Sequence, residues 1–154
     1  MKQLLVYSFT FLMIFGCGTE RHLPKEMEAK TEFGMPLNEF LSFKNSKVEK
    51  QETGMGFRHV YYEEITGKDI AYIVYYFDAD GEKPLYEVLI GYHDQQKRDA
   101  VARQLLGEPN SENNTEWQLK PEKGYEIKAW TYKDKLIITA LIPETEWYED
   151  TYGN

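Results

Sequence analysis

The chain has 154 residues, a formal net charge of −8 and a single cysteine. This length is enough for one domain with its own hydrophobic core. The acidic surplus argues against binding nucleic acid, because the phosphate backbone repels an acidic surface and no run of basic residues breaks the pattern. Since there is no second cysteine, no disulfide within the chain can hold the fold together, and packing of the core has to suffice.

The first 17 residues have the organisation of an export signal. Lys2 is followed by an apolar stretch over residues 4–15, and Gly16 stands directly before Cys17. The stretch is too short to span a bilayer comfortably, which takes roughly 20 apolar residues. A secretory signal needs only a charged start, a short apolar core and a small residue at the cleavage site. The pattern therefore predicts a signal peptide over residues 1–16.

The sequence Ile14-Phe15-Gly16-Cys17 resembles the lipobox of a bacterial lipoprotein precursor, and this resemblance covers the leader alone. It implies that Cys17 is acylated, with fatty acids such as palmitate, and becomes the new N-terminus. Several acyl chains on one residue give stable membrane anchoring, which a single chain does not. The expected location is the cell envelope, with the outer membrane favoured over the inner. An ordinary signal peptide and an uncleaved anchor helix stay open as alternatives.

The rest of the chain divides into three predicted parts. Residues 17–33 are charged and lack an apolar period, so we expect the lipidated cysteine to be followed by a flexible tether. A single α+β domain is expected over residues 34–148, and a frayed tail over residues 149–154. Cleavage after Gly16 removes Lys2 and no acidic residue, which changes the formal net charge from −8 to −9.

Two helices and six strands are predicted within the domain. Apolar spacing and terminal residues predict helices over residues 35–44 and 94–106, the second capped by Asp94 and ended by Gly107. Runs of β-branched and aromatic residues between turn residues predict strands over 57–65, 70–77, 85–92, 115–120, 125–132 and 136–142. The order α-β-β-β-α-β-β-β predicts an α+β fold, with a single antiparallel sheet of five or six strands and two helices packed on one face.

No pattern in the chain predicts catalysis, a metal or a cofactor. The spacing of His22, His59 and His93 does not fit a metal site. The sequence Asp-Ala-Asp-Gly over 78–81, with Glu87 six residues after its glycine, has part of the spacing of a calcium loop, but a hairpin turn explains it. The serines lack a glycine elbow or an adjacent base. We therefore expect a protein that is not an enzyme.

Aromatic residues are abundant on the predicted strands, and 12 of them are tyrosines. Exposed aromatic patches mark partner surfaces, so we predict one at Tyr72, Tyr75, Tyr86, Tyr92 and Trp130. The alternative for many of these rings is a place in the core. The chain thus predicts a lipid-anchored envelope protein that binds another envelope protein without catalysis. Alternatives are a lipoprotein that binds carbohydrate or a small ligand, and an immunity-type inhibitor of a basic toxin.

Overall fold

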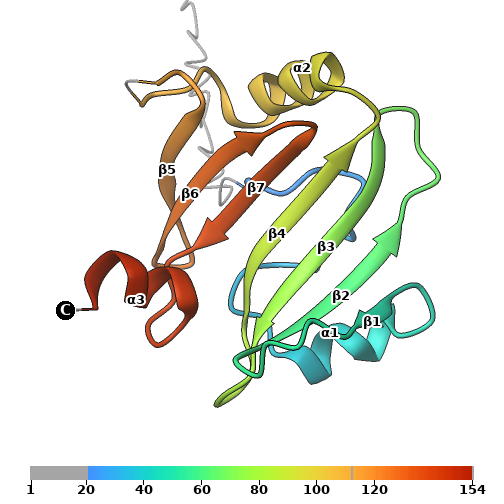
Figure 1. Ribbon diagram of the computed structural model, residues 1–154, viewed down its shortest axis with the longest axis vertical. Helices are drawn as coiled ribbons and strands as arrows, with labels where there is room; N and C mark the ends of the chain where they lie inside the picture. The colour runs from blue at the N-terminus through green and yellow to red at the C-terminus, as the bar shows by residue number, and fades with distance from the viewer. Residues whose placement is uncertain (1–20, 112, 154) are drawn as a thin grey trace, which may run out of the picture.

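The computed structural model describes residues 21–111 and 113–153, which form one seven-stranded antiparallel sheet with three helices (Figure 1). In chain order the elements are α1 (Leu37–Lys44), β1 (Glu49–Gln51), β2 (Arg58–Glu64), β3 (Ile70–Asp78), β4 (Leu85–Tyr92), α2 (Gln95–Leu106), β5 (Glu116–Glu122), β6 (Tyr125–Tyr132), β7 (Lys135–Ala140) and α3 (Glu146–Tyr152). The strands lie in the order β1-β2-β3-β4-β7-β6-β5, which places β4 in the middle.

The α+β class and the single antiparallel sheet are confirmed. Each of the six predicted strands and two predicted helices is present, with bounds within two residues of those expected. The predicted number of elements was too low, because β1 and α3 were not foreseen. β1 is a three-residue edge strand, exposed along its whole length, that pairs with β2.

The main core lies on one face of the sheet, which we call the covered face. The strand register brings one row of side chains together there, because directly opposite residues of antiparallel strands share a face. The row consists of Trp117, Ala129, Ile138, Val88, Tyr75 and Tyr61. From α1, the fully buried Phe40 packs onto it, with its ring centroid 4.7 Å from that of Tyr75. α2 contributes the fully buried Ala102.

The N-terminal segment, residues 21–36, is part of this core, so the prediction of a tether is wrong for residues 21–33. Its apolar side chains Leu23, Met27 and Phe33 are 3%, 2% and 1% exposed and join the main hydrophobic cluster. In Figure 1 the blue segment runs behind the strands. The backbone N–H of Gly34 donates to the carbonyl of Leu85, which fixes the end of the segment to β4. Cys17 and the predicted signal peptide lie outside the described residues.

α3 packs on the opposite side of the sheet, so the prediction of a frayed tail is wrong for residues 149–152. Its anchor is Trp147, whose ring lies 5.0 Å from that of Trp130 on β6 at an interplanar angle of 70°. The indole N–H of Trp147 also donates to the carboxylate of Glu87 on β4. Tertiary contacts of this kind therefore order a short helix that has no continuous apolar stripe.

Candidate functional site

The face of the sheet opposite the core is only partly covered. α1, α2 and the N-terminal segment supply the core of the covered face, whereas α3 covers one corner of the other. Strand register places a band of aromatic and aliphatic side chains on this second face. We call it the open face and define it by Tyr62, Tyr72, Val74, Leu89, Ile137, Trp130 and Tyr132.

A stacked pair of tyrosines forms one end of the open face. The rings of Tyr62 and Tyr72 lie 5.4 Å apart at an interplanar angle of 27°. Tyr72 lies flat on the sheet over Gly91, where a Cβ would come within 2.3 Å of its ring. Glycine at this position therefore makes room for the aromatic layer. At the other end Tyr132 is 58% exposed.

The five residues predicted as a partner surface do not lie together. Tyr72 and Trp130 are half-buried on the open face. Tyr75, Tyr86 and Tyr92 are only 0%, 1% and 2% exposed, so the expectation that these three form a surface patch is wrong.

Two of the three buried tyrosines have identifiable roles in the fold. Tyr75 lies in the core row, and the hydroxyl of Tyr86 donates to Glu146 at 2.9 Å. Sequence reasoning missed Tyr62 and Tyr132 as members of the open face. Tyr62 alternates with the buried Tyr61 and Glu63, but alternation along one strand does not specify which face lacks a covering layer.

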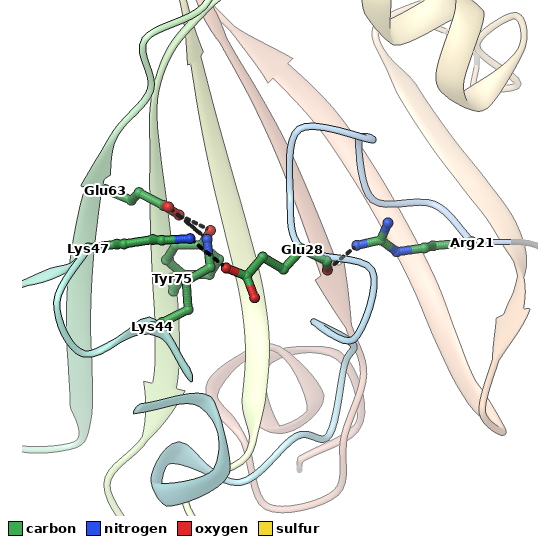
Figure 2. A network of polar contacts seen from close by, with 6 residues as sticks. All are labelled: Arg21, Glu28, Lys44, Lys47, Glu63 and Tyr75. Carbon is green, nitrogen blue, oxygen red and sulfur yellow. Dashed lines mark hydrogen bonds and ion pairs between the residues drawn. The ribbon is translucent and has the colours of Figure 1, made fainter. Parts of the chain in front are cut away.

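A buried polar network joins α1 to β2 and β3 under the covered face (Figure 2). The ammonium of Lys44 donates to both carboxylate oxygens of Glu63, each at 2.7 Å. The hydroxyl of Tyr75 donates to the same carboxylate at 2.5 Å. Burial, together with this carboxylate, raises the pKa of Tyr75 well above its ordinary value, so it stays a donor. The three groups satisfy one another and are 2%, 6% and 0% exposed, which suits a structural role.

A second ion pair ties the N-terminal segment to the loop after α1. Lys47 donates to the Glu28 carboxylate at 2.8 Å, and this hydrogen bond lowers the pKa of Glu28. Arg21 donates to the backbone carbonyl of Glu28 at 2.9 Å, as Figure 2 shows. Lys47 remains more than half exposed, so its ion pair contributes little to stability. The apolar residues of the segment, rather than these charges, hold it in place.

Glu87 is the one acidic residue of the otherwise apolar strand β4, and it faces α3. It is 6% exposed, and burial raises the pKa of its carboxyl from 4.5 to about 7. The hydrogen bond from Trp147 opposes this shift, and the nearby carboxylate of Glu146 adds to it. Arg58, which donates to Glu146 at 3.1 Å, is the neighbouring cation. The charge of Glu87 therefore changes near neutral pH at the point where α3 contacts the sheet.

Replacing Glu87 with glutamine is expected to stabilise the protein at pH 8 and to have a smaller effect at pH 5. The folded state holds the Glu87 proton more tightly than the unfolded chain does, so stability falls as the pH rises from about 4.5 towards about 7. Glutamine stays neutral and can still accept from Trp147. The expected gain at pH 8 is up to about 3 kcal/mol. Urea unfolding at both pH values measures it, and an equal effect at pH 5 and pH 8 would contradict the assignment.

Within the described ranges no three His, Cys, Asp or Glu side chains are placed to hold a metal ion together. His59 and His93 lie towards opposite ends of the sheet, because His59 pairs with Phe77 whereas His93 follows Tyr92, the partner of Ile70. No helix in the described part of the chain is long and apolar enough to cross a membrane. The chain matches no protein-family model, no curated protein and no solved structure in the comparisons made.

Proposed function

We propose that the protein is a non-catalytic binding module, held at the cell envelope by a lipid on Cys17, whose open face binds another protein. The lipobox supports the anchor, and the open face supports the binding. The observation that carries the proposal is a sheet face with aromatic residues at both ends of an aliphatic row and only one corner under a helix. Apolar surfaces of this kind, rich in tyrosine and tryptophan, are typical of protein interfaces.

Charge indicates what kind of protein binds there. Tyr62 and Trp130 belong to one cross-strand row of side chains on the open face. This row continues beyond Tyr62 to Glu49 and beyond Trp130 to Glu116, and both glutamates are exposed. Neither carboxylate has an ion pair among the described residues, and the chain as a whole carries −8. An apolar centre between acidic ends is complementary to a partner with an apolar patch flanked by lysine or arginine. A basic toxin bound by an immunity-type lipoprotein is one example of such a partner.

Replacing Tyr62 and Tyr72 together with alanine is expected to weaken partner binding by about tenfold or more, because tyrosine is among the residues that carry most of the affinity of protein interfaces. The measurement is quantitative co-purification of the partner from detergent-solubilised native membranes, using the full chain. Thermal unfolding of the purified variant confirms that it still folds.

The matched control is the double replacement of Tyr148 and Tyr152, a second pair of contacting tyrosines, on α3. It removes the same atoms from another surface and is expected to leave partner recovery unchanged. Equal recovery with both double variants, or equal loss, would argue against the open face as the contact.

A further inference from the structure

A cavity of about 770 Å³ lies between α3 and the strands β5 and β6. Its floor is the outer surface of these strands, including Gln118, Lys128 and Trp130, and Trp147 and Asp150 of α3 line it too. The volume is within the range typical of sites for small ligands. It adjoins the open face at Trp130 but does not include the tyrosine pair.

Two tryptophans give this cavity a fixed aromatic corner. The Trp130 and Trp147 rings meet nearly at right angles, so they present surfaces of different orientation. Trp147 is held by its hydrogen bond to the buried Glu87, and Trp130 is held in the ladder opposite Ile137 and Glu116. The corner is therefore preformed by the fold, which lowers the entropy that a ligand has to overcome on binding.

Some polar groups that line the cavity are already satisfied. The side chain of Asn110 donates to the carbonyl of Gln118 at 2.8 Å and accepts from its backbone N–H at 2.7 Å. Thr139 donates its hydroxyl to the carbonyl of Tyr86, and the Ser111 hydroxyl accepts from the N–H of Glu116. These residues shape the wall and have little hydrogen-bonding capacity left for a ligand.

The remaining polar side chains are uncommitted and mixed in kind. Glu116, Gln118, Lys128 and Asp150 form no side-chain hydrogen bond or ion pair with any other residue in the described part of the chain. They offer carboxylate acceptors, an ammonium donor and an amide that does both. A purely anionic or cationic ligand would match only some of them. A ligand with several hydroxyls, each both donor and acceptor, matches the whole set.

We infer that this cavity binds a short, uncharged oligosaccharide. The apolar face of a sugar ring packs against the Trp130 and Trp147 corner, and its hydroxyls bond with Gln118, Lys128 and the carboxylates. The inference does not depend on the proposed protein-binding function, because Tyr62 and Tyr72 lie outside the cavity.

The test is tryptophan fluorescence of the full chain in detergent, titrated with triacetylchitotriose, cellotriose and maltotriose, and with choline as a cationic probe. We expect at least one trisaccharide to shift the emission with a dissociation constant of about 1 mM or below. The double variant Gln118→Ala with Lys128→Ala keeps both tryptophans and is expected to weaken that binding about tenfold or more. The control double variant Tyr62→Ala with Tyr72→Ala is expected to bind the sugar as the unmodified chain does.

Three results would overturn the inference. They are no response to any of the three trisaccharides, tighter binding of choline than of the sugars, and unchanged sugar binding in the Gln118 and Lys128 double variant. Circular dichroism of each variant shows whether it is folded. If the cavity variant is unfolded, the single replacements Gln118→Ala and Lys128→Ala take its place. Unchanged sugar binding in both single variants would then overturn the inference.

Discussion

Replacing Glu63 with alanine is expected to lower the free energy of unfolding by about 3–5 kcal/mol, the range found when one partner of a buried ion pair is removed. The change leaves the ammonium of Lys44 and the hydroxyl of Tyr75 buried without their shared acceptor. Water cannot readily take over, because these two residues are 2% and 0% exposed. Urea unfolding followed by circular dichroism measures the loss.

A triple variant tests whether the loss of stability comes from leaving buried polar groups unpaired. Lys44→Met, Glu63→Leu and Tyr75→Phe together keep most of the volume and remove every polar group. Since apolar replacement of a whole buried network is often neutral or stabilising, this variant is expected to be clearly more stable than Glu63→Ala alone. If Glu63→Ala changes stability by less than about 1 kcal/mol, the network is not the closed, buried unit described above.

Replacing Phe33 with alanine is the second change with a large expected effect, about 3–5 kcal/mol, as for other buried aromatic residues. Phe33 is 1% exposed in the main cluster, although it lies in a stretch that the sequence predicts to be a tether. In a tether the same change would be neutral. Chemical unfolding of the Phe33→Ala variant therefore shows directly whether this segment is part of the core or a flexible tether.

The control is Lys25→Ala in the same segment, where the lysine side chain is exposed. It is expected to change stability by less than about 0.5 kcal/mol. A similar small effect for Phe33→Ala and Lys25→Ala would mean that residues 21–33 do not contribute to the core.

The elements that the sequence predicts correctly are those with a strong period or clear ends. The strand over 70–77 is apolar on both faces and lies inside the sheet as β3. The helix over 94–106 has its Asp94 cap, which accepts from the N–H of Lys97, and ends at Gly107. Local residue choice determines such features, so they can be read without knowledge of the tertiary structure.

The missed features depend on contacts between distant parts of the chain. Leu23, Met27 and Phe33 have no helical or strand period, because their segment crosses the sheet as irregular chain and only its contacts bury them. α3 depends on the contact of Trp147 with Trp130.

The open face could not be located for a similar reason. Which tyrosines are exposed depends on where α1, α2 and the N-terminal segment pack, and alternation along one strand does not specify this. Of the residues predicted for a partner surface, Tyr72 and Trp130 lie on the open face, whereas Tyr75 belongs to the core.

The most direct test of the central claim, that the open face binds a protein, is site-specific photo-crosslinking in intact cells. A photo-reactive phenylalanine analogue at Tyr132, which is 58% exposed on the open face, is compared with the same analogue at the exposed Gln104 on α2. We predict a discrete protein adduct from position 132 that is absent from position 104 and is lost when Tyr62 and Tyr72 are also replaced with alanine. The same adducts from both positions, or an adduct that survives the double replacement, would contradict it.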